Sequence, residues 1–215
     1  AIPLVDNTFA PPITHNPLSL SADVVIHSAS KFLGSHGAVM GGVVCGRTEL
    51  IAEISAFREL TGTSLDARSA ALLLRSLKTL ALRVERHNSN ALAVAHFLAE
   101  HPKVSVVHYP GLETHPNHHI ARRQMQGFGG VVSFELHGGL QAAERMLPQL
   151  QLAYLAPNLG QVETVAGPAE VTSHVELTDA ERAASGIPAG LVRYAVGIED
   201  ASDLQADLQQ ALAAI

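Results

Sequence analysis

The chain has 215 residues and a formal charge of −6, from 14 Lys and Arg against 20 Asp and Glu. This mild acidity argues against nucleic acid or an anionic membrane as partner, because phosphate binding depends on clustered Lys and Arg. Hydrophobic residues make up 47% and charged residues 16% of the chain, which predicts a sizeable core and argues against global disorder. The single cysteine cannot form an internal disulfide, and neither a signal-peptide pattern nor about 18 consecutive apolar residues occurs. We therefore expect a cytoplasmic protein without a membrane segment.

The N-terminal part of the sequence predicts strands around a glycine-rich turn. The opening AIPLVDNTFAPP places an apolar run directly before Asp6 and Asn7. Residues 23–30 form a short, continuous, β-branched run, which is typical of a strand buried on both faces, as in a parallel sheet. Glycines then recur over 34–46 and interrupt a second β-rich run at 43–44.

The rest of the sequence predicts a mixed α/β fold. Apolar residues at three- and four-residue spacing predict long helical stretches over 69–100, with room for a kink at 80–82. Pro102 ends this pattern, because proline disfavours helical geometry in the residue before it. Strands are then predicted at 104–108, 131–136, near 154 and at 191–197, and helices near 118–125 and at 140–150, 178–185 and 201–215. We expect a domain boundary near residue 101.

Lys31 directly follows the strand predicted at 23–30 and precedes the glycine-rich turn. An unpaired ammonium is costly to bury, and burial shifts an amine toward its neutral form. The neutral amine is the form that Schiff-base chemistry requires. Taken alone, Lys31 has an alternative interpretation as a lysine at a strand end whose ammonium reaches solvent.

Three other residues extend this pattern. In an extended segment Ser28 and Ser30 point to the same side, so two hydroxyls could bind a phosphate. Asp6, after an earlier β-like run, could supply a carboxylate to a protonated ring nitrogen. With Lys31 these groups match the requirements of pyridoxal phosphate (PLP). The alternative for residues 6–8 is a turn with local side-chain capping.

Five segments then carry a resemblance to a known family. They are VDNTFAPP, VVIHSASKFLGSHG, LLLRSLKTLALRVERHNSNA, YPGLETHPNHHIARRQMQGFGGVVSFEL and GLVRYAVGIEDASDL. In this order they resemble the Cys/Met-metabolism family of PLP-dependent enzymes, the transsulfuration group of cystathionine γ-synthases, cystathionine γ-lyases, methionine γ-lyases and homoserine-ester sulfhydrylases. The resemblance covers essentially the whole chain.

The resemblance implies PLP fold type I, as in aspartate aminotransferase. Residues 1–100 would be the C-terminal part of the large, mostly parallel-sheet PLP-binding domain with the long connecting helix, and 101–215 the smaller α/β C-terminal domain. It also implies that Lys31 carries pyridoxal 5′-phosphate, that Ser28 and Ser30 bind its phosphate, that Asp6 pairs with the pyridine nitrogen, and that Thr8 lies against the ring.

Further positions concern the substrate. The arginine of the GLVR-like segment resembles the family's anchor for the substrate α-carboxylate, which implies Arg193; without the family, a structural ion pair is the alternative. Asn158 stands where many relatives have serine, close to the cofactor lysine, and Glu163 falls in a stretch that resembles the reaction-specificity region. We include Asn158 and Glu163 among the predicted substrate-binding residues.

The implied function is γ-elimination or γ-replacement on a sulfur amino acid or an activated homoserine, of the cystathionine γ-synthase or γ-lyase type, through a Schiff base on Lys31. Methionine γ-lyase and sulfhydrylase activities are related alternatives, and the implied assembly is a homotetramer, a dimer of dimers. The family's phosphate-loop glycines, ring-stacking tyrosine and tyrosine–arginine pair precede the VDNT segment and are not in this sequence. We therefore expect that 215 residues alone do not complete a site, and a truncated, non-catalytic assembly module is the alternative function.

Two other features of the sequence could indicate a second site, but we expect no site at either. His115 and His119 could share a helix face, but Pro116 lies between them and no further ligand is nearby, so we expect no metal. Cys45 lies in an apolar run flanked by glycines, which favours a buried, inert thiol.

Overall fold

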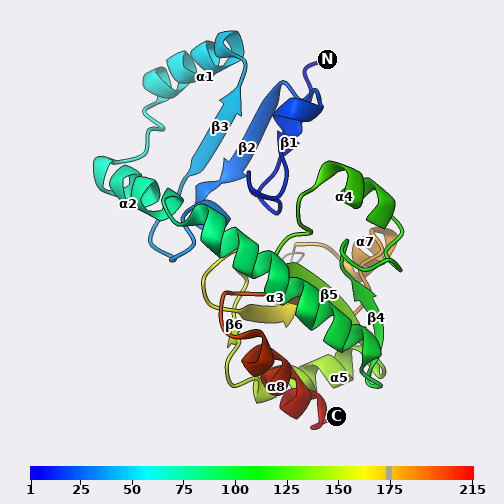
Figure 1. Cartoon of the computed structure of the whole chain (residues 1–215). Coiled ribbons are helices and arrows are strands. Elements are labelled where there is room, and N and C mark those ends of the chain that lie inside the picture. The colour runs from blue at the N-terminus through cyan, green and yellow to red at the C-terminus, as the bar shows by residue number, and fades with distance from the viewer. Residues whose placement is uncertain (173–175) are drawn as a thin grey trace.

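The computed structural model of the chain describes residues 1–172 and 176–215. Within them, two sheets lie along one long helix, α3 (Leu80–Glu100), which runs from the first sheet to the second (Figure 1). None of the helices among these residues combines the length and the hydropathy that crossing a bilayer needs. The predicted mixed α/β class is confirmed.

The first sheet has the order β1 (Leu4–Asp6), β2 (Val24–Ser28), β3 (Gly42–Gly46). β1 and β2 are parallel, and β3 is antiparallel to β2. The strand predicted over 23–30 ends two residues early, at Ser28, because the chain leaves the sheet in a π-helical turn, η2 (Ala29–Leu33). The parallel ladder places the carboxyl ends of β1 and β2 at one edge, where open α/β sheets bind ligands.

Helices flank this sheet on the way to α3. α1 (Thr48–Thr61) was not predicted; its apolar residues Ile51, Ile54 and Phe57 recur at three-residue spacing, but none of its residues is buried. α2 (Ala67–Leu77) begins at Asp66, whose carboxylate accepts from Arg68 N and Ser69 N at 3.0 Å each. The break between α2 and α3 falls at residues 78–79 rather than at 80–82. α3 ends before His101-Pro102, as predicted.

The second sheet has the order β4-β5-β8-β7-β6 and is antiparallel except for the β6–β7 pair. Its strands are β4 (Val104–His108), β5 (Val131–Leu136), β6 (Tyr154–Leu155), β7 (Val165–Pro168) and β8 (Val192–Ala195). The helices around it are α4 (His118–Gln124), α5 (Gly139–Met146), α6 (Ala169–Thr172), α7 (Asp179–Ala184) and α8 (Ala201–Leu212). β7 was not predicted, because glycine and proline interrupt its apolar run.

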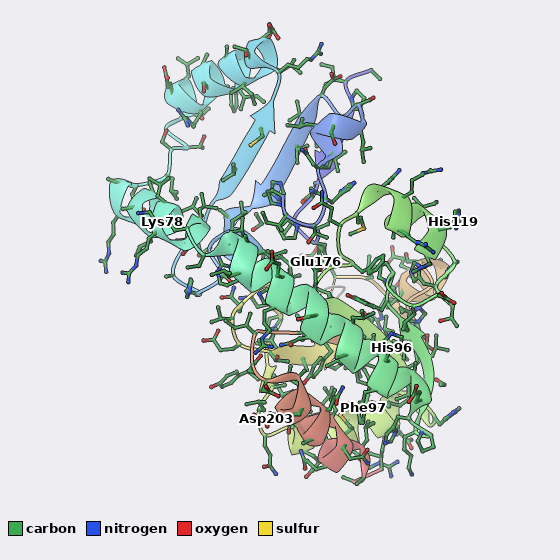
Figure 2. All side chains as sticks on the ribbon, in the orientation of Figure 1. Lys78, His96, Phe97, His119, Glu176 and Asp203 are labelled. Atoms are coloured by element: carbon green, nitrogen blue, oxygen red, sulfur yellow. The ribbon has the colours of Figure 1, made fainter. Side chains whose placement is uncertain are left out.

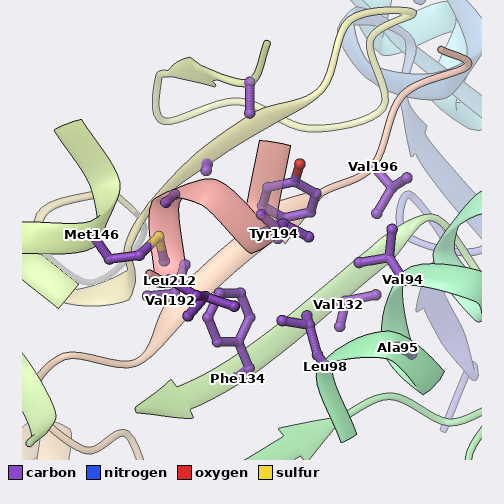
Figure 3. Packing of buried hydrophobic residues seen from close by; sticks show 14 of the residues in the cluster. Val94, Ala95, Leu98, Val132, Phe134, Met146, Val192, Tyr194, Val196 and Leu212 are labelled. Atoms are coloured by element: carbon purple, nitrogen blue, oxygen red, sulfur yellow. The ribbon is translucent and has the colours of Figure 1, made fainter. Parts of the chain in front are cut away.

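The largest core joins the C-terminal half of α3 to this second sheet. Val94, Ala95 and Leu98 of α3 pack with the rings of Phe134 on β5 and Tyr194 on β8 (Figure 3). Side chains of α5 and α8 close the same cluster, including Met146 and Leu212. The C-terminal half of α3 is held in this core, and its N-terminal half extends toward β1–β3, so the helix connects the two sheets (Figure 1).

Candidate active site

Lys31 lies in the turn η2, immediately after β2. Lys31 itself has φ −99° and ψ −134°, outside helical geometry, within a turn closed by bonds from Gly34 N to Ala29 O (2.9 Å) and Ser35 N to Lys31 O (2.7 Å). Ser30 therefore does not continue the strand, and the expectation that Ser28 and Ser30 project from one extended segment is wrong. Ser30 Oγ instead accepts from Gly41 N at 3.1 Å, which leaves its hydroxyl proton free to donate.

Asp6 is the last residue of β1, and Thr8 follows it at the same edge of the sheet. Thr8 N donates to Asp6 Oδ1 at 3.0 Å, and Ser28 N donates to Thr8 Oγ1 at 2.8 Å. The Thr8 side chain and amide, assisted by the charge of His27, hold the pKa of Asp6 below its ordinary value. The site thus has an ionised, exposed carboxylate tied through Thr8 to the end of β2.

Asn158 brings the Lys31 amine into contact with the second half of the chain. Lys31 Nζ donates to Asn158 Oδ1 at 2.5 Å, and Leu159 N donates to the same oxygen at 3.0 Å. Burial lowers the pKa of Lys31, and the positive charge of Arg193 lowers it further. A half-buried lysine with a neutral partner and a cationic neighbour is poised toward the neutral, nucleophilic form.

Arg193, on β8, also contacts Asn158. Its Nη2 donates to Asn158 O at 3.2 Å, and burial lowers the pKa of its guanidinium. The half-buried guanidinium forms no ion pair with any carboxylate in residues 1–172 or 176–215. The structural ion pair considered from the sequence is therefore not found there. A guanidinium without a described carboxylate partner makes this point suited to an anionic group.

The structure does not bring Glu163 into this group. Its side chain is exposed and forms no hydrogen bond or ion pair with a described residue. Its substrate-binding role stays a prediction.

A set of contacts that the sequence does not predict ties the Lys31 turn to the segment around Asn158. Gln161 Nε2 donates to Ser30 O at 3.1 Å, and Ser35 Oγ donates to Gly160 O at 2.9 Å. Val162 N donates to Ser35 O at 2.9 Å. All three bonds end on backbone oxygens, so no pattern of residue types could have revealed them.

Two further expectations from the sequence concern the pair His115 and His119, and the burial of Cys45. α4 begins at His118, so His115 lies outside the helix and cannot share a helix face with His119. Among the described residues, no group of three His, Cys, Asp or Glu side chains could hold a metal ion. The expected burial of Cys45 is wrong: the thiol is exposed, because β3 is the outer strand of its sheet in the described chain.

The profile of the family described as Cys/Met metabolism PLP-dependent enzyme matches residues 1–213. The chain belongs to this family. It is 45% identical over 215 residues to cystathionine gamma-synthase 1, chloroplastic, of Nicotiana tabacum, covering 100% of the chain and 40% of that protein. It is 46% identical over 212 residues to L-methionine gamma-lyase of Fusobacterium nucleatum subsp. polymorphum, covering 97% of the chain and 53% of that protein.

The fold comparison agrees with the family. The crystal structure of cystathionine gamma synthase from Xanthomonas oryzae pv. oryzae in complex with cystathionine matches with a TM-score of 0.96 and 40% identity, covering 99% of this chain and 55% of that one. The predicted PLP fold type I is thereby confirmed. The chain spans about half the length, or less, of the relatives it matches.

Proposed function

We propose that this chain supplies the lysine turn and the C-terminal part of a PLP-dependent transsulfuration enzyme, acting on a sulfur amino acid or an activated homoserine by γ-elimination or γ-replacement. The observation that carries the proposal is the Lys31 amine of lowered pKa beside Arg193, a guanidinium without a described carboxylate partner. The first group suits covalent attachment of an aldehyde, and the second suits the α-carboxylate of an amino acid.

The residues at this edge fit PLP. Lys31 would hold its aldehyde carbon, the hydroxyls of Ser28 and Ser30 its phosphate, and the ionised Asp6 its protonated ring nitrogen, with Thr8 beside the ring. The Ser28 hydroxyl forms no hydrogen bond with a described residue, and the proton of the Ser30 hydroxyl is unused, so both can donate to a phosphate. When bound, PLP supplies an electron sink for the charge that develops on the substrate carbon.

The protein side of the reaction is proton transfer and substrate orientation. Arg193 would bind the substrate α-carboxylate with two parallel hydrogen bonds. The neutral Lys31 amine would take the proton from Cα as general base and then move a proton at Cβ, so that the substituent at Cγ can leave. Asn158 Oδ1 would steady the amine between these transfers, while Glu163 is proposed to contact the part of the substrate that differs between reactions.

Among the subtypes, we propose the cystathionine γ-synthase or γ-lyase reaction ahead of the sulfhydrylase reaction, with methionine γ-lyase as the related alternative. The names of the tobacco and Fusobacterium relatives, at nearly equal identity, support this range of chemistry. The non-catalytic assembly module is not favoured, since the relatives that the chain matches are named as enzymes and the chain retains Lys31, Asp6 and Arg193.

Assembly, location and domain limits are part of the same proposal. We propose a homotetramer built as a dimer of dimers, a cytoplasmic location, and domains at 1–100 and 101–215. The family resemblance supports the assembly, and the single, unpaired cysteine supports a reducing compartment.

The test is an absorbance spectrum of the full-length protein with PLP before and after borohydride reduction, followed by mass mapping of the peptide that contains Lys31. We expect a yellow band that disappears and a pyridoxyl adduct on Lys31, both absent in Lys31→Arg. A colourless protein with unmodified Lys31 would overturn the proposal. The products then separate the subtypes: cystathionine from an activated homoserine and cysteine indicates replacement, and a 2-oxo acid with ammonia indicates elimination.

A further inference from the structure

Arg83 is a buried cation next to the Lys31 turn. It lies in the first turn of α3 and is 5% exposed. No carboxylate of residues 1–172 and 176–215 forms an ion pair with it. A buried charge without a counter-ion is costly unless its polar hydrogens are bound, so the hydrogen bonds of Arg83 identify what keeps it there.

Those hydrogen bonds end on the Lys31 turn and on the end of α2. Nη1 donates to Phe32 O at 2.8 Å, and Nη2 reaches Leu33 O at 3.5 Å and Ser76 O at 2.8 Å. Nε donates to Thr79 Oγ1 at 3.1 Å. The guanidinium therefore binds the carbonyls of the two residues that directly follow Lys31.

No other donor in the described chain serves these two carbonyls. The backbone bonds of the turn end on Ala29 O and Lys31 O, and Gln161 binds Ser30 O. The ring of Phe32 packs against Leu159 of the second half. Arg83 is thus the donor that holds the carbonyls of Phe32 and Leu33 at the exit of the turn.

The same face of α3 also holds the chain beyond Arg193. His87 and Asn90 follow Arg83 at four and seven residues and are both 1% exposed. His87 Nδ1 donates to Val196 O at 2.7 Å, and Asn90 Nδ2 donates to Gly197 O at 3.1 Å. One face of α3 therefore forms hydrogen bonds both to the Lys31 turn and to the residues that follow the strand carrying Arg193.

We propose that Arg83 is a positioning residue for Lys31: by binding the carbonyls of Phe32 and Leu33, it holds the turn so that the Lys31 amine meets Asn158 beside Arg193. This inference rests on the proposed function for its purpose. Lysine cannot replace arginine here, because a point-charge ammonium cannot bind both carbonyls and Thr79 Oγ1 at once.

The experiment measures the titration of Lys31 by competitive acetylation of the full-length protein without PLP, between about pH 6 and pH 11. The chain has three lysines, and the exposed Lys78, at the break between α2 and α3 (Figure 2), and Lys103 are internal references. The variants are Arg83→Met and Arg83→Lys. Arg86→Met, which removes an exposed arginine from the same helix, is the matched control.

In the parent, we expect Lys31 to titrate below the ordinary range of a lysine, because its pKa is lowered by burial and by Arg193. In both Arg83 variants we expect the titration of Lys31 to move up toward the ordinary range of a lysine by about one unit, because the freed amine reaches water and leaves Arg193. Arg86→Met leaves it in place. A structural role alone would lower the melting temperature and leave the titration of Lys31 unchanged in the folded protein, and that result overturns the proposal.

Thr79→Val keeps the test decisive if neither Arg83 variant folds. It removes the acceptor of Arg83 Nε from an exposed position, and we expect a smaller upward shift for Lys31. No shift in Thr79→Val would then overturn the proposal. Because the titration uses no PLP, it also separates the two claims: a parent protein whose Lys31 forms no adduct with PLP overturns the proposed function, while the Arg83 variants still decide this inference.

Discussion

Lys31 Nζ lies 2.5 Å from Asn158 Oδ1, although 127 residues separate the two in the sequence. The backbone oxygen of Asn158 accepts from Arg193 Nη2 at 3.2 Å. One neutral residue therefore joins the lysine of the first sheet's turn to the arginine of the second sheet. Because the partner is neutral, burial and Arg193 can lower the pKa of Lys31 without a counter-ion to oppose them.

Asn158→Asp tests this neutrality. The new carboxylate would favour the ammonium form, so we expect the pKa of Lys31 to rise by about one to two units. Turnover near neutral pH should fall about tenfold or more, with partial recovery at higher pH, because less of the amine is neutral. Competitive acetylation and a pH–rate profile measure the two effects. Asn158→Ser, which keeps a neutral acceptor, is the control, and an equal pKa in both variants would contradict the argument.

Arg193→Lys tests carboxylate binding. A lysine keeps the charge but loses the planar pair of donors, so we expect KM for the amino-acid substrate to rise about tenfold or more. The value of kcat should fall less than kcat/KM, because Lys31 is retained. Steady-state kinetics measure both. Arg145→Lys, at an exposed position on α5, should leave both constants unchanged; an unchanged KM in Arg193→Lys would show that the carboxylate binds elsewhere.

Thr8→Val tests the link between the ends of β1 and β2. Valine cannot accept from Ser28 N, and an unsatisfied, partly buried donor costs about 1–2 kcal/mol of unfolding free energy. The pKa of Asp6 should also rise toward its ordinary value, because the Thr8 hydroxyl is its largest cause of lowering. Denaturant unfolding measures the first effect. Thr61→Val, at an exposed position at the end of α1, should cost little.

Patterns local to the sequence predicted most of the elements, and they also predicted Lys31. β-branched runs gave β2 and β5, and helical periodicity gave α3 and α8, because each of these elements buries apolar residues in the core. α1 was not predicted, although its apolar residues recur at three-residue spacing, and in the structure none of its residues is buried. Cys45 was misjudged because the sequence does not say which strand is outermost.

The geometry around Lys31 depends on contacts that no local pattern encodes. The turn η2 needs Arg83, 52 residues after Lys31, to bind its exit, and Gln161 to bind Ser30 O. Both contacts end on backbone oxygens, which every residue has. Residue types could therefore suggest which side chains are candidates for chemistry, but not that Ser30 leaves the plane of the strand.

Gly160→Ala tests how closely the two halves of the chain meet at the turn. Gly160 has φ +69°, and a Cβ there would lie 2.7 Å from Phe32 N. Gly62 is a matched control, with φ +70° and no atom within 4 Å of its Cβ position. We expect Gly62→Ala to cost about 1 kcal/mol of unfolding free energy from backbone strain alone. Gly160→Ala should cost clearly more, because a backbone atom must also move. Equal losses of unfolding free energy would mean that Phe32 can move away from the added Cβ at little cost.

His87 gives the chain a pH dependence of stability with a defined sign. The side chain is 1% exposed, donates from Nδ1 to Val196 O, and packs edge-on against Phe32 with ring centroids 5.1 Å apart. Burial lowers the pKa of His87 to about 4, against 6.5 for an unperturbed histidine. Between these values the unfolded chain binds a proton that the folded chain does not, so this contribution is complete above pH 6.5 and is lost as the pH falls toward 4.

The full loss corresponds to roughly 3 kcal/mol, at 1.36 kcal/mol for each unit. Asparagine keeps an N–H donor for Val196 O but does not titrate, so His87→Asn should be less stable near pH 7 and should lose less stability on acidification than the parent. His15 and His27, whose pKa values burial also lowers, act in the same direction in both proteins and cancel in the comparison. His96→Asn, an exposed position on the same helix (Figure 2), should keep the parent's slope. Urea unfolding at a series of pH values measures the slopes, and parallel curves for the parent and His87→Asn would show that His87 is not the group responsible.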